Sequence, residues 1–415
     1  MKIKHILLTI VIFLFVDASA EMVRYSGGDI SMYPTYQKAG SQYKDQNGNN
    51  IDLLPYLHEI GMNAMRVRLF VNPDGYTYNN KGQKEDDSNV CQDLPYIIPL
   101  CKDIISNGFD LMLDFHYSDT WADPGKQYIP DAWKGLSDEV LADSIYNYTK
   151  NSLVTLKENG ITPKFIQPGN EISYGMLWAD SSDKAYYGQN NSKAWKRFGD
   201  FLDAAIRACR EVCEEAQIVI HTERIAQVDV LKNFYSQMKS LNIDYDIIGL
   251  SYYPYFHGTM AKLDNALTVV EREFPDKPIM IVETGFPYEY EVQGTTEKVE
   301  YEYTLAGQDA YAHALVDTLL SHPNVNGLFW WWLEYNAYGA GLTGWYNAPL
   351  FNSKDGKATP ALKTIASFSS GAGIEEIMDE GRIADPYWYD LQGRRHKTPD
   401  SPGIYFHNGE KFIVK

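Results

Sequence analysis

The chain has 415 residues, of which 44% are hydrophobic, 22% are charged and 14% are aromatic, and its formal net charge is −18 at pH 7. This length and apolar content allow a large core in one big domain or in two to three ordinary ones, which excludes a disordered or fibrous protein. The negative charge would repel DNA and acidic membrane surfaces, so we expect no nucleic-acid partner and favour a neutral substrate.

The N-terminus has the pattern of a secretory signal peptide. Two lysines in the first four residues precede an apolar stretch at 6–16 and an Ala-Ser-Ala sequence at 18–20. A membrane anchor is the alternative, but the apolar stretch is shorter than the roughly 20 residues that a span needs. We therefore expect cleavage near Ala20, no membrane span, and a mature chain that is secreted or kept in the cell envelope, in the periplasm or at the outer surface.

Apolar, β-rich runs recur along the rest of the chain and predict eight strands. The runs are VRYSGGDI from Val23, NAMRVRLF from Asn63, FDLMLDFH from Phe109, KFIQPGN from Lys164, QIVIHT from Gln217, YDIIGLSYY from Tyr245, KPIMIVET from Lys277 and VNGLFWWW from Val325. Helical periodicity fills the gaps between them, for example at 51–60, 94–106, 140–156, 195–213 and 263–274.

Alternation of strands and helices predicts an α/β fold, a (β/α)8 TIM barrel over residues 21–370. Three of the helices end in EIGMN, SNGFD and ENGIT, where Gly61, Gly108 and Gly160 can adopt a left-handed cap before the next strand. A doubly wound sheet is the alternative. It would usually carry a Gly-rich phosphate turn after its first strand, and GGDIS lacks that spacing.

The character of the sequence changes after residue 370. SSGAG at 369–373 is typical of a linker, and residues 374–415 contain a hairpin signal at Asn408-Gly409. A segment of about forty residues cannot bury much apolar surface alone. We expect a small C-terminal β module, which resembles modules on some exported bacterial enzymes and would imply sorting or packing rather than catalysis.

Four cysteines are too few for a disulfide scaffold in a chain of this length. Cys209 and Cys213 lie one turn apart on a predicted helix, Cys91 precedes another helix, and Cys101 lies within it. Buried free thiols are the favoured interpretation. Because the sequence has no CxxC pair and no HExxH motif, a zinc site is not expected.

Acidic residues at the carboxyl ends of the strands are the candidates for catalysis, because a barrel of this kind carries its chemistry there. Four such residues are Asp114, Glu171, Glu283 and Glu334, and each alone is more often a salt-bridge or capping residue. Glu171 and Glu283 differ from the others in having uncharged or aromatic neighbours, and their strands face each other across a barrel. Cleavage of a glycosidic bond needs such a pair, one carboxyl to protonate the leaving oxygen and one to attack or to activate water.

The motifs around these glutamates resemble those of the clan A retaining glycosidases. GNEI at 169–172 and VETGFPY at 282–288 look like the signatures of the acid/base and the nucleophile. Further segments are similar to the endo-β-1,4-galactanases of glycoside hydrolase family 53: GGDIS at 27–31, MRVRLFVNP at 65–73, DFHYSDTWADPGKQ at 114–127 and SYYPYFHG at 251–258. The resemblance runs from about Tyr25 to Phe368, and the third-strand motif is its most specific part.

The resemblance implies a hydrolase that cuts β-1,4-galactan, a side chain of pectin, internally and with retention. It makes Glu171 the acid/base and Glu283 the nucleophile. A physical argument agrees, since Glu171 must keep a proton near neutral pH and the charge of Glu283 would help it to do so. Arg66 and Arg68 face the same side of the second strand, where either could hold Glu283 ionised or form a structural ion pair.

The same resemblance implies the substrate contacts. Asn170 would bind a sugar 2-hydroxyl, His116 would contact the same sugar, and Tyr253 would bind the nucleophile. Trp331 would lie under the reacting sugar and Trp121 would stack further out, although packing alone is the alternative for both tryptophans and a structural role is the alternative for His116. We place Arg68 with these substrate-binding residues. The 31 tyrosines and 9 tryptophans suit stacking on sugar rings, and equally a Tyr-rich core.

Three segments depart from the family pattern. GLFWWWLEYN at 327–336 leaves open which of its tryptophans faces the substrate, and HTERIAQ at 221–227 replaces a turn that contains Gly and Asp. PYEYEVQGTTEK at 287–298 has no Asp and no regular spacing of oxygen ligands, where some members bind calcium. We therefore expect no metal, no other cofactor and a monomer. A mannanase or cellulase of the same clan, or a non-catalytic glycan-binding barrel, are the alternatives.

Overall fold

The computed structural model describes residues 22–79, 82–185, 191–335, 348–371, 388–390, 395–398, 403–407 and 410–414. The predicted signal peptide at 1–20 and the predicted Asn408-Gly409 turn lie outside these residues, as does the segment from 372 to 387. None of the helices in the described part of the chain combines the length and apolar character that crossing a bilayer requires.

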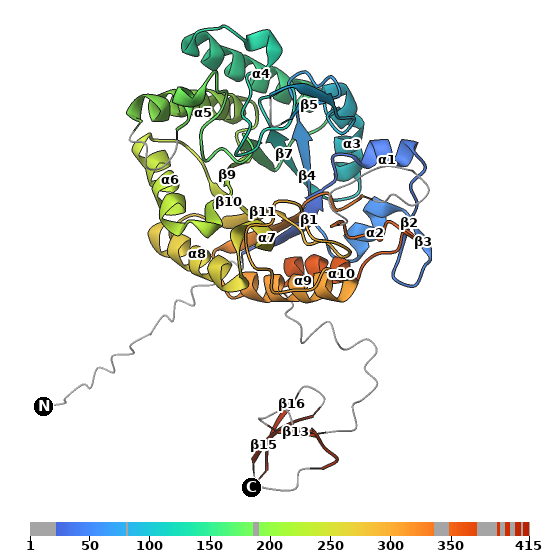
Figure 1. The fold of residues 1–415 in the computed structure, drawn as a ribbon. Helices are drawn as coiled ribbons and strands as arrows, with labels where there is room; N and C mark the ends of the chain where they lie inside the picture. Colours follow the sequence, from blue (N-terminus) through green and yellow to red (C-terminus); the bar gives the residue numbers. More distant parts are fainter. Residues whose placement is uncertain are drawn as a thin grey trace, which may run out of the picture.

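Within the described residues, eight parallel strands close into a barrel that helices surround (Figure 1). The strands are β1 (Tyr25–Asp29), β4 (Ala64–Leu69), β7 (Asp110–Phe115), β8 (Phe165–Pro168), β9 (Gln217–Thr222), β10 (Ile247–Tyr252), β11 (Ile279–Thr284) and β12 (Val325–Trp330). Each lies inside one of the eight predicted runs, and β1 pairs with both β12 and β4 to close the ring. The predicted TIM barrel is confirmed.

The helices cover the outside of the barrel. They are α1 (Tyr33–Lys38), α2 (Leu53–Glu59), α3 (Leu94–Ser106), α4 (Asp138–Glu158), α5 (Ser192–Val212), α6 (Val228–Ser240), α7 (Pro254–His257), α8 (Met260–Glu273), α9 (Leu305–Leu320) and α10 (Ala361–Ser367). Two short hairpins, β2 (Tyr43–Lys44) with β3 (Asn50–Ile51) and β5 (Tyr76–Tyr78) with β6 (Lys84–Asp86), lie in the loops. The five predicted helices are confirmed with small shifts in their bounds. The helix α4 starts earlier than predicted because the Ser137 side chain accepts a hydrogen bond from the Val140 N–H and caps it.

The predicted glycine caps are present at the ends of α2, α3 and α4. Gly61, Gly108 and Gly160 have φ values of 105°, 88° and 78°, a region of backbone conformation that other residues rarely adopt. The chain therefore reverses into β4, β7 and β8 at the positions that the sequence indicated.

Alternation along the strands fills the barrel with two layers of different chemistry. The deeper layer is a buried apolar cluster to which every strand contributes: Tyr25, Ala64, Met112, Phe165, Val219, Ile247, Met280, Val282 and Phe329. Inward-facing residues recur every second position, so the next layer towards the carboxyl ends contains Arg66, Asp114, Gln167 and His221. These four side chains are polar and completely buried. The apolar layer thus closes the barrel from below, and the polar layer faces the carboxyl ends of the strands.

The described residues of the C-terminal tail form a separate antiparallel sheet in the order β14-β13-β15-β16. Its strands are β13 (Trp388–Asp390), β14 (Arg395–His396), β15 (Gly403–His407) and β16 (Glu410–Val414). Strands β15 and β16 pair on either side of the predicted turn. The tail therefore has the predicted β character, whereas its independence as a module stays a prediction.

Close packing of β1 against β4 predicts that Gly27 cannot be replaced. A Cβ at this position would lie 1.7 Å from the carbonyl oxygen of Ala64, a backbone atom that cannot move without breaking the strand pair. We expect Gly27→Ala to lower the free energy of unfolding by at least about 3 kcal/mol. Urea unfolding measures this, with Gly125→Ala as the control because its new Cβ would approach only the Asp123 carboxylate, at 3.3 Å. A Gly27 variant as stable as the control would contradict this packing.

Candidate active site

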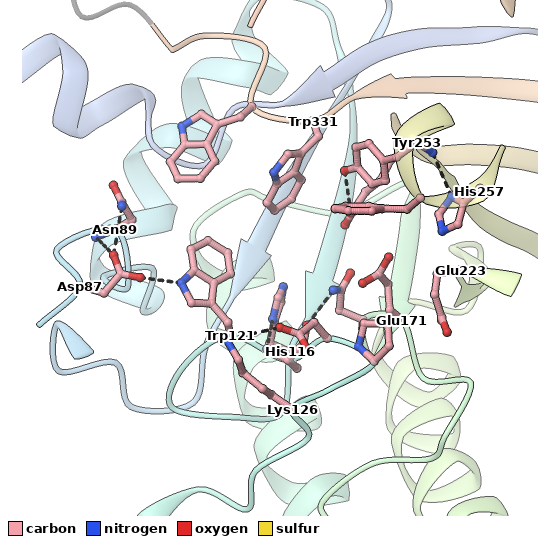
Figure 2. A pocket seen from close by; sticks show the side chains of 17 residues that line it. Asp87, Asn89, His116, Trp121, Lys126, Glu171, Glu223, Tyr253, His257 and Trp331 are labelled. Atoms are coloured by element: carbon pink, nitrogen blue, oxygen red, sulfur yellow. Dashed lines mark hydrogen bonds and ion pairs between the residues drawn. The ribbon is translucent and has the colours of Figure 1, made fainter. Parts of the chain in front are cut away.

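A cavity of about 610 Å³ opens at the carboxyl end of the barrel strands (Figure 2). Acidic, aromatic and amide side chains from most of the strand-end loops surround it. The lining residues are Asp87, Asn89, His116, Trp121, Ala122, Asp123, Pro124, Lys126, Asn170, Glu171, Glu223, Tyr253, Phe256, His257, Glu283, Trp331 and Trp332.

The two predicted catalytic glutamates converge in this cavity. Glu171 lies in the loop directly after β8. Glu283 is the second-to-last residue of β11. An oxygen of the Glu171 carboxyl group lies within 4.8 Å of an oxygen of the Glu283 carboxyl group. Carboxyl groups about 5 to 5.5 Å apart are typical of retaining glycosidases, whereas inverting enzymes separate them by about 6.5 to 9.5 Å. The close approach therefore fits the retaining geometry.

Two neighbours stabilise Glu283 as a carboxylate. Its Oε1 lies 2.9 Å from a guanidinium nitrogen of Arg66, and its Oε2 accepts a hydrogen bond of 3.2 Å from the Tyr253 hydroxyl. Burial raises the pKa of Glu283 to about 7, while Arg66 and the Tyr253 hydrogen bond oppose that rise. Near neutral pH, Glu283 is thus the more readily ionised member of the pair.

Glu171 has the opposite environment. The cation that contacts Glu283 does not contact it, and the neutral Ser251 hydroxyl donates a hydrogen bond of 2.7 Å to its Oε1. Burial, followed by the negative charges of Glu283 and Glu223, raises the pKa of Glu171 well above its usual range. The Glu171 backbone has φ 47°, a left-handed conformation that is costly for a residue with a Cβ and that is typical of functional sites.

Arg66 connects the site to the floor of the barrel. Its guanidinium is completely buried and lies 3.1 Å from Asp29 and 2.8 Å from Asp114, and it donates a hydrogen bond of 2.9 Å to Asn170 Oδ1. Burial opposes the ionisation of Asp114, but Arg66 and then His116 outweigh it and lower the pKa of this carboxyl group. A single cation therefore contacts three carboxylates and an amide.

Arg68 takes a different role from Arg66. Its guanidinium is completely buried, pairs with Asp29 at 2.7 Å, and lies 4.8 to 5.3 Å from the ring centres of three tryptophans, which are Trp121, Trp331 and Trp332. Arg68 was predicted to bind substrate, but it is not among the residues that line the cavity. Arg68 therefore stabilises the three tryptophan rings, because a cation over the face of an aromatic ring is attracted to its π-electrons.

Asn170 and His116 lie where the sequence predicted, at the wall of the cavity. Asn170 Nδ2 donates to the Ala122 carbonyl at 2.8 Å, which fixes the amide and leaves its second N–H for a ligand. His116 Nδ1 accepts from the Ala122 backbone N–H at 3.1 Å, and its Nε2 lies 3.0 Å from Asp114. Both ring nitrogens of His116 thus face protein atoms, so any contact it makes with a sugar is through the ring.

The three consecutive tryptophans at the end of β12 separate into two groups. Trp330 is completely buried and donates from its indole nitrogen to the Ala348 carbonyl at 2.8 Å. Trp331 and Trp332 line the cavity, and their ring centres each lie 6.2 Å from that of Trp121. The structure therefore excludes Trp330 from the cavity wall and puts Trp331, Trp332 and Trp121 on one aromatic wall.

Several polar residues of the site were missed in the sequence. Asp29 ends β1 and binds both buried arginines, and Glu223 follows β9 and lines the cavity. His221, whose pKa burial lowers well below its usual range, lies 2.8 Å from the Ser251 hydroxyl that contacts Glu171. Asp29, His221 and Glu223, like Ser251, lie at or next to the ends of their strands, so the positional argument that identified Glu171 would also have found them.

The carboxylates of Glu171 and Glu283, with His221, form a cluster whose ligand atoms lie within 4.8 Å of one another. Each group already has protein partners: Ser251 for Glu171, Arg66 for Glu283, and Ser251 and the amide N–H of Gln167 for the two nitrogens of His221. A cation here would also meet the positive charge of Arg66. These residues therefore fit proton transfer better than metal binding.

The four cysteines are free thiols, and all except the half-buried Cys91 are buried.

Comparison with known proteins identifies a family. The sequence profile of glycosyl hydrolase family 53 matches residues 25–365. The chain is 31% identical to an arabinogalactan endo-β-1,4-galactanase of Cellvibrio japonicus over 359 residues, which cover 81% of this chain and 89% of the relative. It is 32% identical to an uncharacterised protein of Niallia circulans over 371 residues, which cover 85% and 96% of the two chains.

Solved structures agree with the sequence comparison. The catalytic domain of a family 53 enzyme from Ignisphaera aggregans matches with a TM-score of 0.71 and 31% identity, covering 83% of this chain and 95% of that domain. A structure of fungal β-1,4-galactanases matches with a TM-score of 0.68 and 26% identity, covering 83% and 99%. The catalytic core of xylanase A has a TM-score of 0.52 at 15% identity, which shows a common barrel fold alone.

Burial of the Glu334 carboxyl group predicts a pH-dependent stability. This completely buried carboxyl accepts a hydrogen bond of 2.9 Å from the Met32 N–H, and burial raises its pKa to about 8. The folded state therefore holds the proton more tightly than the unfolded state. The stability from this group is complete below about pH 4.5 and is lost as the pH rises through about 8, at about 1.4 kcal/mol per pH unit.

Glu334→Gln keeps the acceptor for Met32 but cannot ionise. We expect the variant to gain stability relative to the wild type as the pH rises from 5 to 8, measured by urea unfolding at each pH. Glu158→Gln, at an exposed position at the end of α4, is the control that should parallel the wild type. Parallel curves for Glu334→Gln and the wild type would show that Glu334 is not protonated in the folded state.

Proposed function

The chain belongs to glycosyl hydrolase family 53, and on that basis we propose that it is an endo-β-1,4-galactanase that retains the anomeric configuration. One observation carries this proposal. Carboxyl oxygens of Glu171 and Glu283 lie within 4.8 Å of one another, and of these two glutamates Glu283 is the one that contacts the buried guanidinium of Arg66. Two carboxyl groups in such unequal environments can share the roles of proton donor and nucleophile. Relatives named as galactanases support galactan as the substrate.

The first step forms a covalent glycosyl-enzyme. The Glu283 carboxylate attacks the anomeric carbon while Glu171 gives its proton to the glycosidic oxygen, so that the carbon–oxygen bond breaks and the leaving sugar departs as an alcohol. The Tyr253 hydroxyl and Arg66 orient the attacking carboxylate. The N–H of Asn170 that is left over from its bond to Ala122 is available for the sugar hydroxyl next to the reacting carbon.

The second step restores the enzyme. Formation of the ester removes the negative charge of Glu283, which is the second largest cause of the raised pKa of Glu171 after burial. The pKa of Glu171 then falls, and its carboxylate can take a proton from the water that attacks the anomeric carbon. Attack comes from the side that the leaving sugar occupied, so two inversions give net retention.

The aromatic wall supports an extended sugar chain. Trp121 and Trp331 present ring faces and edges to the cavity, and aromatic rings pack against the apolar faces of sugars (Figure 2). Galactan differs from mannan and cellulose in the orientation of single hydroxyl groups, which a few hydrogen bonds decide. The choice of galactan therefore depends on the named relatives, whereas the chemistry depends on the site.

We also propose that the protein is exported, as the signal peptide predicted at 1–20 implies. N-terminal sequencing of the protein from its native host is expected to begin at or near Glu21. An N-terminus that still contains the apolar stretch would contradict export by cleavage.

Activity on defined polysaccharides tests the proposed substrate. We expect release of reducing ends from linear β-1,4-galactan and little release from mannan or cellulose. Glu283→Ala should lower this release by at least about 10⁴-fold, because the nucleophile is lost, while Glu158→Gln should match the wild type. Activity on mannan or cellulose alone would favour another enzyme of the clan. No release from any of the three by the wild type would favour a binding protein.

The pH profile tests the assignment of proton donor and nucleophile. We expect kcat/KM on galactan to rise as Glu283 ionises and to fall at higher pH as Glu171 loses its proton. Tyr253→Phe removes a hydrogen bond that lowers the pKa of Glu283, so the acidic limb should move to higher pH by about 0.5 to 1 unit. An acidic limb that stays in place or moves to lower pH would contradict the role of Glu283.

A further inference from the structure

Glu223 is a further carboxylate in the wall of the cavity, close to Glu171, and the mechanism does not use it. It lies directly after β9 in the HTERIAQ segment, where the sequence departs from the family pattern. Only 8% of its surface is exposed, and that surface faces the same cavity as Glu171. Figure 2 shows Glu223 on the side of Glu171 that faces away from Trp121.

One oxygen of Glu223 is fixed by the protein. Its Oε1 accepts a hydrogen bond of 2.6 Å from the Ser173 hydroxyl and lies 2.9 Å from Arg224 Nε. Arg224 in turn donates to the Ser173 oxygen at 3.0 Å and stacks over the Tyr174 ring at 4.1 Å. These contacts hold the carboxylate in one orientation, so its second oxygen has a defined position.

The second oxygen has no partner among the residues that the structure describes. Glu223 Oε2 is buried and makes no hydrogen bond with any described residue. A buried carboxylate oxygen without a donor is costly, and such atoms usually receive one from water or from a ligand. The donor groups of a neutral sugar are its hydroxyls.

A complementary donor lies at the same end of the cavity. The Tyr253 backbone N–H donates to His257 Nδ1 at 3.0 Å, so the proton of this imidazole is on Nε2. Burial lowers the pKa of His257 to about 4, which keeps the ring neutral. His257 lines the cavity with Glu223, and together they offer one acceptor and one donor, the pattern that binds a hydroxyl group.

From this geometry we propose that Glu223 is a substrate-binding residue that accepts a hydrogen bond from a hydroxyl of the leaving-group sugar, with His257 as the matching donor. The assignment to the leaving group rests on the proposed function. Glu283 and the tryptophans hold the sugar that is attacked, and Glu171 must lie between that sugar and the next one to protonate the bond between them. Glu223 lies beyond Glu171, where the next sugar begins (Figure 2).

Two substrates with different leaving groups test the proposal. Galactotetraose carries a sugar as the leaving group, whereas 4-nitrophenyl β-1,4-galactobioside carries an aryl group without the sugar hydroxyls. We expect Glu223→Gln to lower kcat/KM on galactotetraose by about 10- to 100-fold, the effect of losing a hydrogen bond to a charged group. On the aryl substrate it should remain within about twofold of the wild type, which also shows that the variant folds.

The charge of Glu223 also raises the pKa of Glu171, and the pH dependence separates this effect from sugar binding. Burial raises the pKa of Glu223 as well, so the comparison uses the pH optimum and the alkaline limb of the profile, where Glu223 is most ionised. Loss of a sugar contact lowers kcat/KM at the pH optimum, whereas loss of the charge alone lowers the pKa of Glu171 and moves the alkaline limb to lower pH. Glu223→Asp keeps the charge but withdraws the carboxylate by one methylene. We expect it to show the same selective loss.

Four results would overturn the proposal: equal losses on both substrates, no loss on either, a shift of the alkaline limb with no loss at the pH optimum, or full activity of Glu223→Asp on galactotetraose. Equal losses would mean that Glu223 only positions the loop of Glu171 through Ser173. A wild type that cleaves neither substrate would contradict the proposed function itself, and the inference would fail with it. An active wild type with one of the four results removes the inference alone.

Discussion

The buried guanidinium of Arg66 is the constraint on which the rest of the site depends. It pairs with Asp29 and Asp114, contacts Glu283 at 2.9 Å and fixes the amide of Asn170. Removing one partner of a buried ion pair typically costs about 3 to 5 kcal/mol, because the other charge is left without compensation. Arg66 thus stabilises the polar layer of the barrel and makes Glu283 more acidic than its neighbour.

The arrangement follows from the period of a β-strand. Alternate residues of each strand face the interior, so the apolar layer that includes Ala64 and Met112 is followed two residues later by Arg66 and Asp114. The apolar layer excludes water from below, which strengthens the electrostatic contrast between the two glutamates above it. The proposed proton donor and the proposed nucleophile therefore differ in their depth in the barrel and in their access to a single cation.

Much of this could be predicted from the sequence, because strand alternation and glycine caps are local signals and the strand ends fixed where Glu171 and Glu283 had to lie. Other features depend on contacts between strands. Both arginines of β4 face the interior, and only the packed barrel shows that Arg66, not Arg68, reaches Glu283. The tryptophan register depends on shifts in the pairing of β11 with β12, which no periodicity reveals. The free oxygen of Glu223 is likewise a property of the folded loops.

Trapping the covalent intermediate tests the central claim most directly. A 2-deoxy-2-fluoro-β-galactobioside with a 2,4-dinitrophenyl leaving group slows the second step more than the first, so the glycosyl-enzyme should accumulate and be found by mass spectrometry of the digested protein. The account predicts one added fluoroglycosyl group per chain, on the peptide that contains Glu283. A group on Glu171, or turnover of the reagent with no covalent adduct, would contradict it.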